Sequence, residues 1–81
     1  MDSTSPYQDL VEYIVKSIVD YPDSVHITET VNETSVLLEV HVADSDMGRV
    51  IGRGGSVVNS IRSLLQVLAA KKGKRVSLEI V

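Results

Sequence analysis

A cluster of glycines divides the second half of the chain. Gly52, Gly54 and Gly55 fall within four residues, with Arg53 between the first two. Glycine is costly inside a helix or strand because it loses more backbone freedom on folding than any other residue. The residues on both sides nonetheless show helical spacing. The sequence therefore predicts two helices joined by a tight turn whose backbone comes close to another group, and the arginine favours an anionic one.

Length and composition limit the chain to one small domain with an aliphatic core. The 81 residues leave room for a single domain, predicted over 7–81 after a short polar tail over 1–6. Three tyrosines are the only aromatics, so Val, Ile and Leu must fill the core. Without cysteine there is no disulfide, thiolate metal site or cysteine nucleophile. The polar N-terminus lacks a signal peptide, and no apolar run reaches the ~20 residues that span a bilayer, which predicts a cytoplasmic protein without membrane contact.

The net charge of −3 hides a strong asymmetry along the chain. Residues 1–46 hold ten acids and one base, a charge of −9, whereas residues 47–81 hold seven bases and one acid, a charge of +6. Such an asymmetry points to nucleic-acid or membrane contact. The alternative is that acids and bases neutralise each other across the folded surface. Arginines within and beside the glycine cluster favour an anionic partner.

A helix and a hairpin are predicted in the first half. Apolar residues recur at helical spacing from about Tyr7 to Asp20, with Ser5 as N-cap and Pro6 as the first helical residue. Val25–Val31 and Val36–Val42 alternate apolar and polar residues and are joined by a short polar connector, which indicates an antiparallel hairpin. The residues expected to face inward are Val25, Ile27, Val31, Val36, Leu38, Val40 and Val42.

Two helices and a strand are predicted in the second half. A short helix is predicted after residues 43–46, with Asp44 or Ser45 as its N-cap and with Met47, Val50 and Ile51 on one face. A long helix runs from Ser56 to about Lys71 and is stopped by Gly73. The residues expected to be buried are Val57, Val58, Ile61, Leu64, Leu65 and Leu68 on this helix, and Val76, Leu78 and Ile80 on a strand over 75–81.

The resulting order, α-β-β-α-α-β, predicts an α+β domain in which a three-stranded sheet carries three helices on one face. The segment Ile51-Gly52-Arg53-Gly54-Gly55-Ser56-Val57-Val58 resembles the I-G-x-x-G-x-x-I signature of the KH domain, and the element order is similar to its type II form. A chain of this length resembles the small bacterial RNA-binding proteins of the KhpA (YlqC-type) group. The resemblance implies a non-catalytic protein in post-transcriptional regulation, an RNA chaperone that forms a homodimer or pairs with a KhpB/Jag-like KH protein.

The glycine turn has the chemistry of a phosphate site. The amides of Gly54, Gly55, Ser56 and Val57 lie at the start of the long helix, where N–H groups lack intrahelical partners and the helix dipole is positive. KH loops contact the backbone of about four nucleotides of single-stranded RNA. Because no aromatic lies in residues 25–81, bases cannot stack on side-chain rings there, which predicts modest affinity. The residues predicted to contact RNA are Arg49, Ile51, Gly52, Arg53, Gly54, Gly55, Ser56, Val58 and Arg62.

Several alternatives stay open. The glycines can simply form a helix–helix corner with Arg53 solvated, or the domain can act in protein interaction with weak or no RNA binding. No nucleophile–base–acid constellation, nucleotide-binding glycine loop or small-molecule substrate site is visible, so neither an enzyme nor a cofactor is predicted. His26 and His41 lack companions with metal-ligand spacing and are expected to be exposed strand residues. The basic residues Lys71, Lys72, Lys74 and Arg75 favour a helix C-terminus or extend the nucleic-acid surface.

Overall fold

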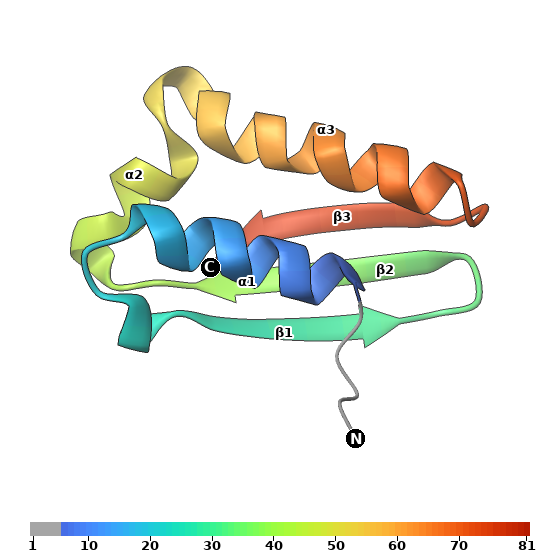
Figure 1. The fold of residues 1–81 in the computed structure, drawn as a ribbon, viewed down its shortest axis with the longest axis horizontal. Coiled ribbons are helices and arrows are strands. Elements are labelled where there is room, and N and C mark those ends of the chain that lie inside the picture. The colour runs from blue at the N-terminus through green and yellow to red at the C-terminus, as the bar shows by residue number, and fades with distance from the viewer. Residues whose placement is uncertain (1–5) are drawn as a thin grey trace.

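The computed structural model describes residues 6–81 and shows a sheet with helices packed on one of its faces (Figure 1). This arrangement confirms the predicted α+β class and element order. The predicted N-cap Ser5 and the tail before Pro6 lie outside the described residues. The helices and strands are α1 (Pro6–Ile18), β1 (His26–Val31), β2 (Ser35–His41), α2 (Met47–Ile51), α3 (Ser56–Ala70) and β3 (Arg75–Ile80).

The sheet has the order β1-β2-β3, with β1 antiparallel and β3 parallel to the central strand β2. The predicted hairpin is therefore confirmed. Val36, Leu38 and Val40 of β2 are buried, as the alternation of β2 predicted. In the register, Leu38 lies opposite Leu78 of β3, so apolar residues of adjacent strands share the covered face. Val31 was expected to face inward but is 53% exposed, because it ends the edge strand β1 beside the hairpin turn.

The helices bury a narrower face than their apolar patterns predicted. On α1 the buried residues are Tyr7, Val11 and Val15, four residues apart, and they pack into the same core as β2. On α3 the residues that enter the core are Val58, Ile61, Leu65 and Ala69. On β3, Val76 and Leu78 are buried and Ile80 is half-buried.

Leu64 and Leu68 were expected on the buried face of α3, and this expectation was wrong. They are 53% and 38% exposed, and Val67 beside them is 64% exposed. The buried residues follow each other at intervals of three and four, which places them along one line of the helix surface. Leu64, Val67 and Leu68 lie to one side of that line and form an exposed apolar face of α3.

Different local structures end α3 and begin α2. After α3, the Lys74 N–H donates to the Ala69 carbonyl at 3.0 Å and the Gly73 N–H to the Ala70 carbonyl at 3.1 Å, with Gly73 at φ +69°. This is a Schellman motif, so Gly73 stops the helix as predicted. Neither Asp44 nor Ser45 caps α2, because a short 3₁₀ turn precedes it and occupies the first amides without a side-chain cap.

Candidate functional site

The glycine turn between α2 and α3 uses conformations that favour glycine at three positions. Gly52 has φ +79° and ψ 171°, Gly54 has φ +62° and ψ 20°, and Gly55 has φ +82° and ψ 14°. Gly54 and Gly55 are in the left-handed helical region, and Gly52 is in a region that is essentially restricted to glycine. The turn lies at the N-terminal end of α3, opposite the end that leads into β3 (Figure 1).

The three glycines differ in the space around them. A Cβ atom on Gly52 would lie 2.6 Å from Cγ2 of Val57 and 2.7 Å from the Val57 backbone nitrogen, so the chain folds back tightly at this point. A Cβ atom on Gly55 would lie 3.2 Å from Nδ2 of Asn59. A Cβ atom on Gly54 would meet no atom within 4 Å. Gly54 thus presents bare backbone to the surface of the molecule.

Two of the four amides predicted to be available at the start of α3 are used within the turn. The Gly55 N–H donates to the Gly52 carbonyl at 3.1 Å, and the Ser56 N–H donates to the Arg53 carbonyl. The expectation that all four amides lack partners was therefore wrong. A 3₁₀ turn over Arg53–Gly55 leads directly into α3 and satisfies them.

The three predicted arginines are placed differently. Arg53 is exposed, and its side chain has no hydrogen bond or ion pair with any of residues 6–81. Arg49 is directed to the end of α1, where its Nη1 lies 3.5 Å from both the Ile18 carbonyl oxygen and Oδ1 of Asp20. Both contacts are long and exposed, hence weak.

Arg62 is held against the neighbouring strand. Its Nε and Nη2 donate to the Leu78 carbonyl at 3.2 and 2.9 Å, and Nη1 donates to Oδ1 of Asn59 at 3.0 Å. Leu78 lies within β3, so this contact bridges α3 and the sheet. The sequence predicted that Arg62 lies near the turn but did not indicate that its guanidinium is hydrogen-bonded to other residues of the domain.

The other predicted site residues line the turn or support it. Ser56 is exposed at the first position of α3, and Ile51 is half-buried at the end of α2. Val58 is buried at 5% exposure, so it supports the turn from the core and offers little surface to a ligand.

Six of the seven bases of the second half lie toward the two ends of α3, and Arg62 lies within the helix. Arg49 and Arg53 lie at the glycine turn, whereas the other end carries Lys71, Lys72, Lys74 and Arg75. Fifteen helical residues separate these ends by about 22 Å. Of the bases in residues 47–81, only Arg49 forms an ion pair within the described part of the chain. Pairwise neutralisation therefore does not account for the basic half.

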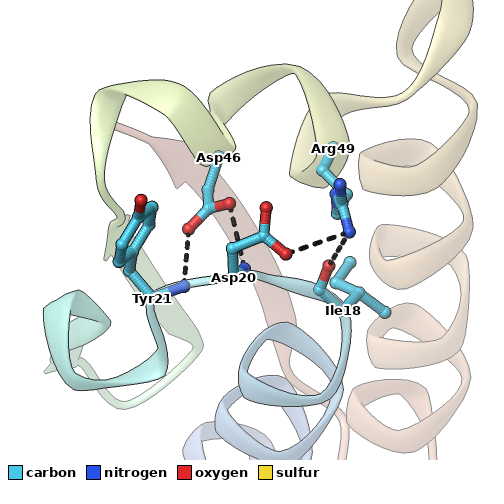
Figure 2. Close-up of polar contacts among 5 residues, drawn as sticks. All are labelled: Ile18, Asp20, Tyr21, Asp46 and Arg49. Carbon is cyan, nitrogen blue, oxygen red and sulfur yellow. Dashed lines mark hydrogen bonds and ion pairs between the residues drawn. The ribbon is translucent and has the colours of Figure 1, made fainter.

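Asp46 is a residue that the sequence analysis did not single out. Its side chain is 1% exposed, and it is the one charged group buried among residues 6–81. Oδ1 accepts a hydrogen bond from the Asp20 N–H at 3.0 Å, and Oδ2 accepts one from the Tyr21 N–H at 3.1 Å (Figure 2). These amides precede it by 26 and 25 residues, so no local spacing in the sequence signals the contact.

Other kinds of site are not supported within the described residues. No enclosed pocket is present, and no three His, Cys, Asp or Glu residues gather where they could hold a metal ion. His26 and His41 lie directly opposite each other at the end of the hairpin, and both are exposed. None of the helices over residues 6–81 combines the length and apolar character needed to cross a bilayer.

Comparison with known proteins gives a consistent set of relatives. A family model described as KhpA/KhpB, KH domain, matches residues 8–80. A protein of Clostridium perfringens named RNA-binding protein KhpA is 43% identical over 74 residues, which cover 91% of this chain and 99% of that protein. Proteins of the same name from Clostridium acetobutylicum and Borreliella burgdorferi are 46% and 47% identical over 72 residues each, covering 89% of this chain and 96% and 88% of theirs.

Proposed function

Because the chain belongs to the KhpA/KhpB family of KH domains, we propose that residues 7–81 form a single KH domain that binds single-stranded RNA through the glycine turn. The family is non-catalytic, and its members in the comparisons are named for RNA binding. We further propose that the protein acts in the cytoplasm in post-transcriptional regulation, including as an RNA chaperone.

The observation that carries this proposal is the exposed backbone of Gly54 beside the unpaired side chain of Arg53. A sugar-phosphate chain can approach the main chain at Gly54, because apart from its two chain neighbours no residue places an atom within 4 Å of the Cβ position there. Arg53 can then donate two hydrogen bonds to a phosphate. The positive end of the α3 dipole lies behind the turn and favours the same anion. Gly52 and Gly55 supply the backbone conformations that form the turn.

The remaining predicted residues contribute around this centre. Arg49 and Arg62 add positive charge on either side of the turn from positions anchored to α1 and β3. Ser56 offers a hydroxyl group at the first residue of α3, while Ile51 and Val58 provide the aliphatic packing beneath. Among the described residues, Arg53 is the one arginine at the glycine turn without a side-chain partner, and residues 25–81 hold no aromatic ring, so we expect a modest affinity for short single-stranded segments.

The double variant Arg53→Asp, Gly54→Asp tests the proposal by fluorescence anisotropy with a short unstructured RNA. Aspartate tolerates the left-handed conformation of Gly54 better than most residues, and the space there is open, so the fold is expected to persist. Electrostatic repulsion of phosphate then predicts an affinity at least about tenfold lower.

The matched control is Lys72→Asp, Gly73→Asp at the other end of α3. It also replaces a base and an adjacent glycine of positive φ, so it lowers the net charge by the same amount. We expect it to bind RNA nearly as well as the unaltered chain. Equal losses in the two variants would mean that RNA responds to overall charge, and unchanged binding in the first variant would refute the proposal.

The exposed apolar face of α3 favours self-association as a second function. Leu64, Val67 and Leu68 are 53%, 64% and 38% exposed on one helix, and α3 carries no acidic residue between Ser56 and Ala70. We propose that a second copy of the chain packs on this face, and that a KhpB/Jag-like KH domain can take its place. Two linked sites would offset weak binding at each turn through effective concentration.

Sedimentation equilibrium of Val67→Glu tests this second function. We expect the unaltered chain to form dimers and the variant to be monomeric, because a carboxylate cannot be buried unpaired in an apolar interface. Thr28→Glu places the same charge on an exposed residue of β1 and should leave the dimer intact. Dimers that persist in Val67→Glu, or an unaltered chain that is monomeric at all concentrations, would contradict the proposal.

A further inference from the structure

The helix that leads into the glycine turn is too short to hold its own position. α2 has five residues, well below the length at which an isolated helix is stable in water. Its place therefore depends on what it contacts. Val50 anchors one side of α2 in the core at 0% exposure. Gly52 follows α2 directly, so any shift of α2 moves the turn.

A polar contact on another side of α2 ties it to the end of α1. Asp46, the residue before α2, accepts the backbone N–H groups of Asp20 and Tyr21, one with each carboxylate oxygen. Arg49, three residues later on the same side, approaches the Ile18 carbonyl and the Asp20 carboxylate (Figure 2). The two side chains thus contact consecutive peptide groups of the segment that leaves α1.

Asp46 and Arg49 differ in how strongly they hold α2 to the end of α1. The Arg49 contacts are 3.5 Å long and its side chain is 56% exposed, so solvent competes with them. The Asp46 carboxylate is buried, and burial of a charge is unfavourable unless its oxygens are hydrogen-bonded. Its two hydrogen bonds form only when residues 20–21 and 46 are correctly placed relative to each other. An arrangement that breaks these hydrogen bonds would leave the carboxylate buried without partners, which is unfavourable.

We infer that Asp46 is a positioning residue for the glycine turn: its contact with Asp20 and Tyr21 fixes α2, and through α2 the presentation of Gly52–Gly55 to RNA. The inference rests on the proposed RNA-binding function for its consequence. The placement of the turn itself can be measured without RNA. Asp46 does not touch the ligand site and acts only through the backbone that joins it to Gly52.

The variant Asp46→Asn keeps the size of the side chain but turns one acceptor into an amide group that faces a backbone N–H. We expect RNA affinity about 3- to 30-fold lower than that of the unaltered chain, the range in which supporting contacts modulate a site. A loss of RNA affinity would point to positioning and not to charge, because removing a negative charge by itself favours binding to RNA. Asp44→Asn makes the same change on an exposed residue of the same 3₁₀ turn and should bind within about twofold of the unaltered chain.

A second control separates positioning from general stability. Val40→Ala opens a cavity in the central strand and removes no group that hydrogen-bonds with Asp46. It should lose stability but retain RNA affinity at temperatures where it is folded. Hydrogen exchange gives the readout that needs no RNA: in Asp46→Asn the Gly55 and Ser56 amides, which close the turn, should exchange faster, while the amides of the central turns of α3 should not.

The outcomes are distinct. A folded Asp46→Asn that matches the unaltered chain in RNA affinity and in exchange at Gly55 and Ser56 overturns the inference and leaves the proposed function standing. Equal losses of affinity in Val40→Ala and Asp46→Asn also overturn it, since stability would then be the cause. An unaltered chain that fails to bind RNA refutes the proposed function, and the exchange comparison still decides the role of Asp46. If Asp46→Asn does not fold, Asp46→Ser, which places no amide donor against the two N–H groups, serves in the same comparisons.

Discussion

Replacing Gly52 with alanine tests how closely the chain folds back at the glycine turn. Two costs add at this position. The backbone at φ +79° and ψ 171° is strained by about 1–3 kcal/mol for any residue with a Cβ atom. The new methyl group would also lie 2.7 Å from the Val57 backbone nitrogen, which a rotamer change cannot relieve, and such overpacking costs about 1–3 kcal/mol.

The net effect of Gly52→Ala is a large fraction of the stability of a chain this size. Alanine restricts the unfolded chain and recovers about 0.4–1 kcal/mol, so we expect the free energy of unfolding to fall by about 1–5 kcal/mol. The total for 81 residues is about 4–12 kcal/mol. Urea unfolding followed by circular dichroism measures the difference directly.

Two other glycines provide matched controls for the same substitution. Gly48 lies within α2 with no atom near its would-be Cβ, so Gly48→Ala should stabilise the protein by about 0.5–1 kcal/mol. Gly54 has open space but φ +62°, so Gly54→Ala should cost about 1 kcal/mol through backbone strain alone. The reasoning would be refuted if Gly52→Ala lost no more stability than Gly54→Ala.

Three further predictions follow from packing and charge. Leu65→Ala should cost about 2–5 kcal/mol and Leu64→Ala less than about 0.5 kcal/mol in urea unfolding at protein concentrations low enough to keep the chain monomeric, because the first is buried and the second exposed in the single chain; equal losses would contradict the observed face of α3. Gly73→Ala should cost about 1 kcal/mol in the same assay by straining the end of α3 at φ +69°; no loss would exclude the Schellman motif. Arg53→Ala should reduce the slope of log affinity against log salt by about 0.7, the effect of one phosphate contact on a single strand; an unchanged slope would show that Arg53 does not neutralise a phosphate.

The elements of this fold could be predicted from sequence because each buries one face with a regular period. Alternation marks β2, where Val36, Leu38 and Val40 are buried as expected, and glycine marks both ends of α3. The helical period did not reveal which part of α3 the sheet covers. Leu64 and Leu68 continue the apolar pattern yet lie outside the contact, whereas Ala69 is fully buried but too small to stand out in a hydrophobic pattern.

The candidate site was predictable at the level of the motif and not at the level of its hydrogen bonds. The glycines and Arg53 are informative by residue type, since few other residues adopt those conformations or bind phosphate so well. Whether a given amide is available depends on the dihedral angles of single residues, which placed Gly55 and Ser56 within a 3₁₀ turn. The role of Asp46 depends on segments far apart in the chain, and an aspartate in an acidic stretch carries no sign of it.

An NMR titration with a short single-stranded RNA tests the central claim most directly. Backbone amide shifts would be followed across the whole chain, with the RNA binding site located by the residues that change. RNA binding at the glycine turn predicts that the largest changes fall on Gly52–Val57, with small changes at the Lys71–Arg75 end of α3. Changes concentrated at that opposite end, or no changes at Gly52–Val57 under saturating RNA, would contradict it.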